Sequence, residues 1–417
     1  MQKGRLEYKR FWLWVSISYG LGILSVAGIV ALVYFTATTL HSKNRLPERQ
    51  QIPSKELALQ RMHHMQMLME LKRKNTEKFV DRMHKKYLKN PGAEMNFLVI
   101  SGGGENGAFG SGFLIGWSGV TEESATMPVF DGVTGVSAGS LIAPFAFIGT
   151  KESLNYIDTF FRNPTDDFVV LRRPIYFLPK NMSLASVPGL ERAIGQAYTV
   201  PIARQIVKRA EPGRLLLIQS TNLDLAFPEI FNFVDAAKES IVQNNSKPME
   251  EIVLASSALP GMFPPREIDG ALYVDGGIEG NFYYGGHPSK PEYTFGGIWK
   301  RKFPHIPIPK TCYWVIINGN LRESPKTSNE GWASIASRSL AISAGSDQVV
   351  ALRELYSIAE LTQLRGLGDV NVRWVAVEEP LPDGNFPDIF NQHEMRRLSD
   401  LGKRLGRDPQ SWNSSSP

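Results

Sequence analysis

The residues best suited to chemistry are a serine between two glycines, in the pattern GxSxG formed by Gly135, Ser137 and Gly139. A strand-like apolar run, 129–134, precedes this pattern, and a helix-like apolar run, 141–148, follows it. In the order strand, sharp turn, helix, GxSxG exposes a serine hydroxyl in a strained backbone conformation. The glycines are needed because side chains there would collide with the neighbouring strand and helix. The pattern therefore predicts that Ser137 is a nucleophile.

A second segment, 101–112, is rich in glycine and leads from a predicted strand into an apolar stretch. Because a glycine loop before a helix exposes backbone N–H groups, it can bind an anion. Gly102, Gly104 and Gly107 also satisfy the dinucleotide fingerprint, and Glu122 stands where a ribose-binding acid is expected. Glu122 does not follow a second strand, however, so the context that the fingerprint needs is missing. We therefore interpret the segment as an anion-binding loop and not as a nucleotide site.

A third segment, 273–277, contains Asp275 followed by two glycines, and the stretch 255–265 precedes it. Taken together, the three segments resemble the patatin-like phospholipase family. That family uses GGGxxG as an oxyanion loop, GxSxG as a nucleophile elbow, and DGG or DGA as the site of its catalytic aspartate. The resemblance spans roughly residues 95–320 and is specific as a set, in order and separation. The chain departs from the family at Asn106, where the loop commonly carries Lys or Arg.

The resemblance, to a bacterial-type member with an N-terminal anchor, implies a three-layer patatin-like α/β fold with a central, mostly parallel sheet flanked by helices. It implies a hydrolase that cleaves carboxylic ester bonds of phospholipids or other lipids through a Ser-Asp dyad, with no cofactor and no metal. Ser137 would be the nucleophile and Asp275 the base. The oxyanion hole would comprise Gly102, Gly103 and Gly104, with the N–H groups of Gly103 and Gly104 as the donors. Since free aspartate, with a pKa of about 3.9, is a poor base, we expect Asp275 beside Ser137 in an apolar setting.

Two other functions are compatible with these residues. In an α/β-hydrolase triad, Ser137 and Asp275 would be followed along the chain by a histidine, for which His287, His305 and His393 are the candidates. A lone histidine in such positions is more often a surface or capping residue. Alternatively, the protein is a non-catalytic module that holds a lipid in the same pocket, although all the residues needed for the reaction are present.

The elements that position these motifs indicate one α/β domain over residues 93–405, because short apolar runs alternate with helical patterns. A composition of 42% hydrophobic and 21% charged residues excludes a disordered, collagen-like or polytopic membrane protein. The single cysteine, Cys312, excludes an intrachain disulfide. The polar end of the chain, 406–417, is predicted to be disordered. Continuous apolarity predicts strands buried on both faces, namely Asn96–Ser101, Val129–Gly135, Arg214–Ser220, Tyr313–Asn318 and Val372–Val377.

The N-terminal arm carries the basic charge of the protein. Residues 1–90 hold 17 Lys and Arg against 6 Asp and Glu, whereas the rest of the chain is net negative. After the basic residues 1–10, the run 11–35 has 25 residues without a charge, enough for a helix to cross a hydrocarbon core of roughly 30 Å. We predict a single-pass transmembrane helix and not a cleaved signal peptide, whose apolar region is shorter. The flanking basic residues nearly balance, so only the amino terminus favours a cytoplasmic N-terminus.

Residues 36–92 link this span to the domain, and one long helix is predicted from Ser54 to Asn90. Because its basic side chains lie near the predicted membrane, it is interpreted as a coiled coil, a helix on anionic lipid, or a spacer packed on the domain, the last being favoured. A membrane explains the basic charge more simply than nucleic acid does, so we expect no nucleic-acid partner. The aromatic and basic stretch 282–303 is interpreted as a lid near the pocket or as a structured insertion.

Overall fold

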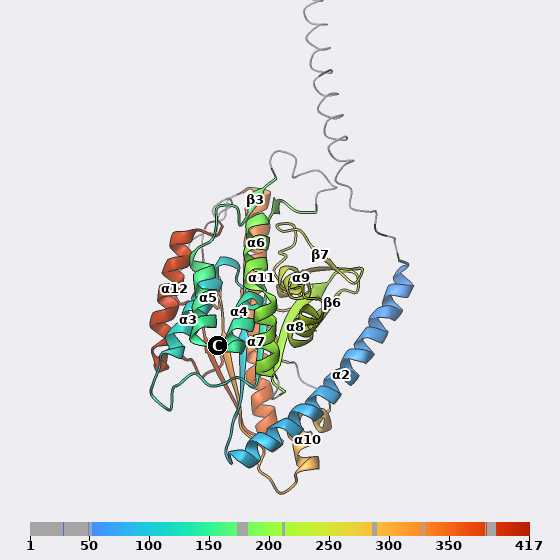
Figure 1. The fold of residues 1–417 in the computed structure, drawn as a ribbon, viewed down its shortest axis with the longest axis vertical. Coiled ribbons are helices and arrows are strands. Elements are labelled where there is room, and N and C mark those ends of the chain that lie inside the picture. Colours follow the sequence, from blue (N-terminus) through green and yellow to red (C-terminus); the bar gives the residue numbers. More distant parts are fainter. Residues whose placement is uncertain are drawn as a thin grey trace, which may run out of the picture. The chain divides into compact units, whose positions relative to one another are not determined.

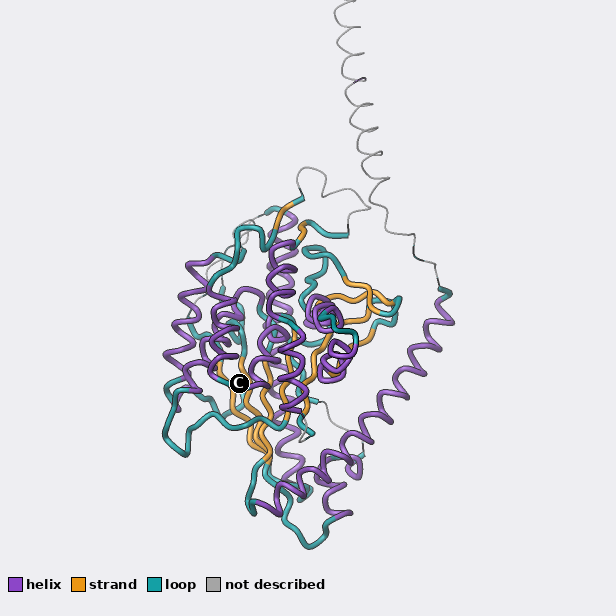
Figure 2. The backbone as a smooth tube through the Cα atoms, viewed as in Figure 1, coloured by secondary structure: helices purple, strands orange, loops and turns teal. Residues whose placement is uncertain are grey.

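An eight-stranded mixed sheet lies at the centre of the fold (Figures 1 and 2). The sheet belongs to a compact unit that extends over Ala58–Pro417. The structure is a computed structural model, and it describes residues 28, 49, 52–172, 182–210, 213–285, 290–325, 327, 330–379, 381 and 389–417.

The strands of this sheet follow the order β10-β9-β1-β2-β5-β8-β7, and β6 pairs with β5. Their bounds are β1 Met95–Ile100, β2 Gly132–Val136, β5 Leu215–Asn222, β6 Phe227–Asn232, β7 Arg266–Ile268, β8 Ala271–Asp275, β9 Thr311–Ile316 and β10 Val370–Val375. A separate two-stranded ribbon consists of β3 Val170–Leu171 and β4 Ala185–Ser186.

The strands predicted from the sequence form the parallel part of the sheet. Strands β10, β9, β1, β2 and β5, in that order, pair in parallel with one another. The strands that escaped prediction, β6, β7 and β8, are antiparallel and mostly half-buried, so they lack a continuous apolar run. The expected α/β fold with a mostly parallel sheet is confirmed.

Helices cover both faces of the sheet, and in Figure 1 α3, α5 and α12 lie together on one side. The helices are α2 Ser54–Lys89, α3 Gly107–Ser118, α4 Ala138–Ile148, α5 Lys151–Arg162, α6 Pro188–Ala197, α7 Val200–Ala210, α8 Phe233–Val242, α9 Lys247–Ser256, α10 Phe295–Lys302, α11 Trp332–Leu364 and α12 Gln392–Gly406. Single turns of 3₁₀ helix occur at η1 Gly104–Asn106, η2 Gly276–Ile278, η3 Pro291–Tyr293 and η4 Pro409–Ser411.

Two hydrophobic cores lie on opposite faces of the sheet. Because side chains alternate along a strand, Leu98 and Ile100 of β1 face one core and Val99 faces the other. The first core contains residues of α3 to α9 and α12, and the second contains residues of α11. Helices, sheet and helices therefore form the three layers that the resemblance implies.

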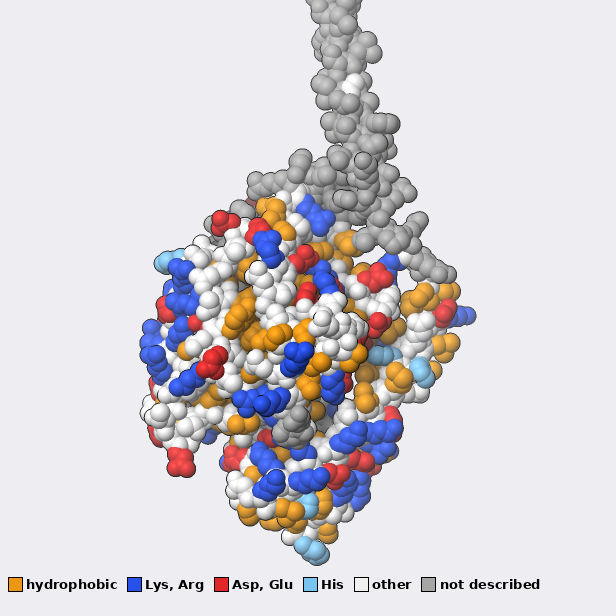
Figure 3. Space-filling view, in the orientation of Figure 1, with side chains coloured by type: hydrophobic (Ala, Val, Ile, Leu, Met, Phe, Trp, Pro, Cys, Tyr) orange, Lys and Arg blue, Asp and Glu red, His pale blue; other side chains and the backbone are white. Residues whose placement is uncertain are grey.

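A third core lies at the end of the sheet where strand β1 begins. There Phe79 and Met83 of α2 pack with Met95 of β1 and with Trp299 of α10. Helix α10 is part of the stretch 282–303. It is a structured insertion at the end of the sheet where β1 begins, whereas the β2–α4 turn lies at the opposite end of the strands. The interpretation of α10 as a lid is wrong, because its aromatic side chains are buried against α2. Basic side chains gather over α2 and α10 on the face seen in Figure 3.

A buried carboxylate holds α2 against this end of the sheet through hydrogen bonds. Asp131, which is 2% exposed, accepts hydrogen bonds from Arg82 at 2.6 Å, from Lys86 at 3.0 Å, and from the backbone N–H of Asn96 at 3.0 Å. The long helix predicted from Ser54 is confirmed as α2, and over this part it packs on the domain.

Replacing this carboxylate should destabilise the domain. In Asp131→Ala two cations and one backbone N–H group lose their acceptor, so we expect the free energy of unfolding to fall by roughly 3 kcal/mol, the lower end for a broken buried pair. Urea denaturation measures the change. Asp235→Ala is the control. Both side chains of the ion pair between Asp235 and Lys238 are exposed, so this pair should contribute less than about 1 kcal/mol to the free energy of unfolding. Equal losses of unfolding free energy in the two variants would contradict the role of Asp131 in holding α2.

The end of the chain is ordered, so the prediction of a disordered tail is wrong. The ring of Trp412 lies 5.0 Å from Phe113, 4.8 Å from Trp117 and 5.0 Å from Trp314, between ring centroids. Asn413 and Trp374 exchange two backbone hydrogen bonds at 2.8 and 3.0 Å. Burial of one large aromatic side chain stabilises a segment whose other residues are mostly polar.

The predicted transmembrane run, 11–35, lies outside the described residues except for Gly28. Among the residues that are described, no helix has the length and apolarity needed to cross a membrane.

Candidate active site

Ser137 lies in the turn between β2 and α4, as the GxSxG pattern predicts. Its backbone adopts φ +51° and ψ −121°, and a positive φ is uncommon for a residue other than glycine. A Cβ atom on Gly135 would collide with the carbonyl oxygen of Gly139, and one on Gly139 with the carbonyl oxygen of Ile100. Both glycines are therefore required by the close approach of α4 to the ends of β1 and β2.

Other serines hold the backbone of this strained turn. The N–H of Ser137 donates to Ser256 Oγ at 2.9 Å, and Ser256 Oγ donates to the carbonyl of Gln219 at 2.6 Å. The hydroxyl of Ser140 donates to the carbonyl of Ser137 at 2.6 Å. Sequence reasoning missed Ser256, because no local pattern indicates a partner 119 positions away.

Asp275 is the last residue of β8 and lies against the serine. Its Oδ2 atom accepts a hydrogen bond from Ser137 Oγ at 2.6 Å, and its Oδ1 atom accepts one from the N–H of Gly277 at 2.8 Å. Asp275 is only 5% exposed, and this burial raises its pKa to about 6, although the hydrogen bonds from Ser137 and Gly277 act in the opposite direction. The carboxylate is therefore a stronger base than free aspartate and is still mostly ionised at neutral pH.

The backbone around Asp275 is fixed by its neighbours. The N–H of Asp275 donates to the carbonyl of Ala258 at 2.9 Å, and the hydroxyl of Thr221 donates to the carbonyl of Asp275 at 2.9 Å. A Cβ atom on Gly276 would collide with the carbonyl oxygen of Gln219. The glycine after Asp275 thus lets the β8 turn approach β5, which brings the carboxylate to the serine.

The glycine loop passes beside Ser137, between β1 and α3. The N–H of Gly102, which the resemblance places in the oxyanion hole, donates to the carbonyl of Asn281 at 2.9 Å and so is not free to bind an anion. Its lack of a side chain matters instead, because a Cβ atom there would collide with the amide of Asn281. Within the described parts of the chain, the N–H groups of Gly103 and Gly104 have no acceptor. These two donors are available to an anion.

The outer side of the loop is tied to α12. The carboxylate of Glu105 accepts hydrogen bonds from the N–H groups of Phe390 and Asn391, the latter at 3.2 Å. A negative charge is stabilised at this position, because the N-terminus of a helix carries a partial positive charge. Asn106, where the family commonly has a basic residue, is half-buried and makes no side-chain capping bond to α3.

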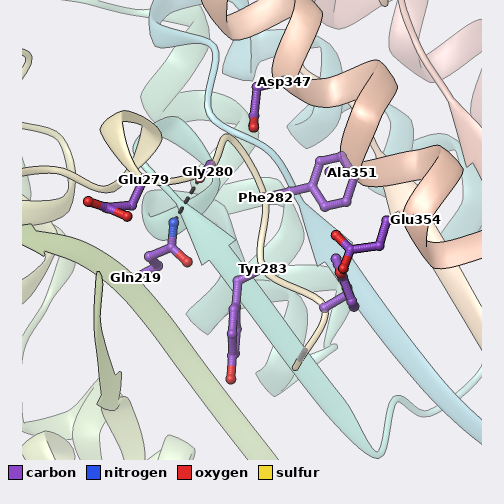
Figure 4. A pocket seen from close by; sticks show the side chains of 9 residues that line it. Gln219, Glu279, Gly280, Phe282, Tyr283, Asp347, Ala351 and Glu354 are labelled. Carbon is purple, nitrogen blue, oxygen red and sulfur yellow. Dashed lines mark hydrogen bonds between the residues drawn. The ribbon is translucent and has the colours of Figure 1, made fainter. Parts of the chain in front are cut away.

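A cleft of about 200 Å³ lies beside the turn that follows Asp275 (Figure 4). The Gln219 amide in its wall donates to the carbonyls of Gly276 and Gly280 at 2.9 and 2.8 Å. Ser137 and Asp275 are not among the residues that line the cleft, so it adjoins the pair without enclosing it. Its lining residues are Gln219, Glu279, Gly280, Phe282, Tyr283, Tyr284, Asp347, Ala351 and Glu354.

The histidines proposed for a triad do not join the pair in the part of the chain that is described. His305 and His393 are both exposed, and neither is among the partners of the Asp275 carboxylate. His287 lies outside the described residues. Across the described ranges, no group of three His, Cys, Asp or Glu side chains is placed to hold a metal ion.

A comparison with family models agrees with this geometry: residues 98–284 match the family described as patatin-like phospholipase. The chain carries a patatin-like phospholipase domain. It is accordingly a hydrolase of lipid ester bonds. The matched range contains the glycine loop, Ser137 and Asp275, and it ends before β9, β10 and α12.

Other comparisons add little to this match. No curated protein matches the chain. Among solved structures, VipD from Legionella pneumophila is similar with 12% sequence identity and a TM-score of 0.34, over 78% of this chain and 68% of that chain. A likeness of that size carries no argument about the site.

Proposed function

We propose that this patatin-like domain hydrolyses lipid esters through a dyad in which Ser137 is the nucleophile and Asp275 the base. The observation that carries the proposal is the 2.6 Å hydrogen bond between Ser137 Oγ and Asp275 Oδ2, made without an intervening histidine. The oxyanion donors are the N–H groups of Gly103 and Gly104.

Two steps complete the reaction. In the first, Ser137 Oγ attacks the ester carbonyl as its proton passes to Asp275, and collapse of the tetrahedral intermediate releases the alcohol, which takes the proton. In the second, water attacks the acyl-serine ester while Asp275 accepts a proton from that water, and the fatty acid leaves as Ser137 regains its hydrogen. In both steps the carbonyl oxygen becomes an oxyanion, and a single fixed donor lowers the barrier by roughly 2.7 to 4 kcal/mol.

A fluorophosphonate probe tests the nucleophile and the base together. We expect labelling at Ser137, identified by peptide mass spectrometry, in the full chain with phospholipid vesicles present. Because only ionised Asp275 can accept the proton and its pKa is raised to about 6, the labelling rate should rise with pH and reach half its plateau near pH 6. Labelling of another residue would overturn the assignment. A half-point near pH 4, the range of free aspartate, would contradict a base strengthened by burial.

We also propose that residues 11–35 anchor the enzyme as a single transmembrane helix with a cytoplasmic N-terminus. Support comes from the 25 uncharged residues of this run and from the basic residues on either side of it. Deleting residues 1–40 should move the protein from the membrane fraction to the soluble fraction. Membrane association of the truncated chain that resists 1 M salt, a concentration that screens surface charges, would contradict the anchor.

A further inference from the structure

Asn318 is a buried polar residue that the dyad mechanism does not use. It lies after the end of β9, beyond the range matched by the family, and is 2% exposed. Strands β9 and β1 are parallel neighbours, with Ile316 opposite Ile100. Since the carboxyl ends of parallel strands meet at one edge, Asn318 comes to lie against the glycine loop that follows β1.

The side chain of Asn318 joins the two ends of that loop. Its Nδ2 atom donates to the carbonyl of Ser101 at 2.7 Å, and its Oδ1 atom accepts a hydrogen bond from the N–H of Gly110, in α3, at 3.1 Å. Its backbone N–H donates to Ser101 Oγ at 2.8 Å, and that hydroxyl donates to the carbonyl of Gly102 at 2.7 Å. Every polar atom of the amide group therefore holds backbone on one side or the other of residues 103 and 104.

The loop also lies directly on Asn318. A Cβ atom on Gly103 would collide with the carbonyl oxygen of Asn318, and one on Gly110 would collide with its Oδ1 atom. Gly103 and Gly104 have positive φ, at +157° and +56°, so the backbone between the two anchored ends is bent. A bend of this kind keeps one orientation only where its surroundings fix it.

We propose that Asn318 is a positioning residue, which aims the N–H groups of Gly103 and Gly104 at the oxyanion. This inference rests on the proposed dyad mechanism. Asn318 does not touch the reacting atoms and acts through the loop. Donors that stabilise the oxyanion are worth most in the transition state, so loss of their alignment should lower kcat and leave KM nearly unchanged.

Asn318→Asp tests the proposal with the full chain and a short-chain p-nitrophenyl ester. The change keeps the volume and the acceptor for Gly110, but replaces the donor to Ser101 by an oxygen that repels its carbonyl. At pH 8.5, chosen to favour ionisation of the new carboxyl group, we expect kcat to fall roughly 100-fold, as for removal of one oxyanion donor, with KM within threefold. The affinity for a trifluoromethyl ketone, which forms a tetrahedral adduct, should fall with kcat/KM.

Asn320→Asp is the matched control. Asn320 is a half-buried amide whose Nδ2 atom likewise donates to backbone carbonyls, but to those of Val377 at 2.7 Å and Glu379 at 2.8 Å, which are not part of the glycine loop. The Asn320→Asp variant should keep kcat within threefold of the wild-type value. Asn318→Ala introduces no charge and gives a second measurement, with a loss of at least tenfold in kcat expected.

The outcomes separate this inference from the mechanism beneath it. If Ser137→Ala is inactive and both folded Asn318 variants keep kcat within threefold, the positioning role is wrong and the dyad stands. A larger effect on KM than on kcat would also overturn the role. Failure of both variants to fold would overturn it as well, because Asn318 would then serve the sheet and not the loop. If Ser137→Ala remains active, the proposed mechanism itself fails.

Discussion

Ser137→Ala should lower kcat for ester hydrolysis by about 10⁶, the loss found when a serine nucleophile is removed from a comparable enzyme. The methyl group cannot attack the carbonyl, and it cannot make the 2.6 Å hydrogen bond by which the Ser137 hydroxyl reaches Asp275. The backbone bonds from Ser256 and Ser140 to residue 137 do not involve its side chain, so the turn should persist. Hydrolysis of a p-nitrophenyl ester and of phospholipid vesicles measures the change.

Ser118→Ala is the control for this result. Ser118 is half-buried like Ser137, and its hydroxyl donates within α3 to the carbonyl of Ile115 at 2.9 Å. Its replacement should leave kcat within threefold and the thermal transition unchanged within a few degrees. Ester hydrolysis by folded Ser137→Ala within tenfold of the wild-type rate would sink the assignment of the nucleophile.

The features that could be predicted from the sequence are those with a local cause. Strands β1 and β2 lie in the middle of the parallel part of the sheet and are largely buried, and burial on both faces gives a continuous apolar run. The turn at Ser137 was predictable because the GxSxG pattern between a strand-like run and a helix-like run is local, although the collision that requires Gly139 is with Ile100 of the neighbouring strand β1. Asp275 was placed by resemblance, and its contact with Ser137 follows from strand order, which local patterns do not reveal.

The features that escaped prediction depend on partners far along the chain. The sequence does not show that the N–H of Gly102 donates to the carbonyl of Asn281, a residue 179 positions away. The role of Asn318 could not be predicted from the sequence, because a single amide after a strand forms no motif and its partner Ser101 is 217 positions away. Helix α10 was expected near the pocket because its aromatic residues follow Asp275, yet chain proximity does not fix the sheet edge at which a segment packs.

Asp275→Asn should be nearly as damaging as loss of Ser137 if the dyad is correct. The amide keeps the shape and can still accept hydrogen bonds, but it cannot take the proton that Ser137 must lose, and no other base stands at the site among the described residues. We expect kcat to fall by well over 10⁴, and the rise of the labelling rate around pH 6 to disappear.

The histidine variants then separate the dyad from a triad. In a triad the aspartate only orients a histidine, so its loss costs about 10⁴, whereas loss of the histidine is as damaging as loss of the serine. For the dyad we expect His305→Ala and His393→Ala to stay within threefold of wild type, since both side chains are exposed and neither contacts Asp275. His287→Ala is the decisive third variant, because this residue lies outside the described part of the chain. A folded but inactive histidine variant, beside residual activity in Asp275→Asn, would replace the dyad by a triad.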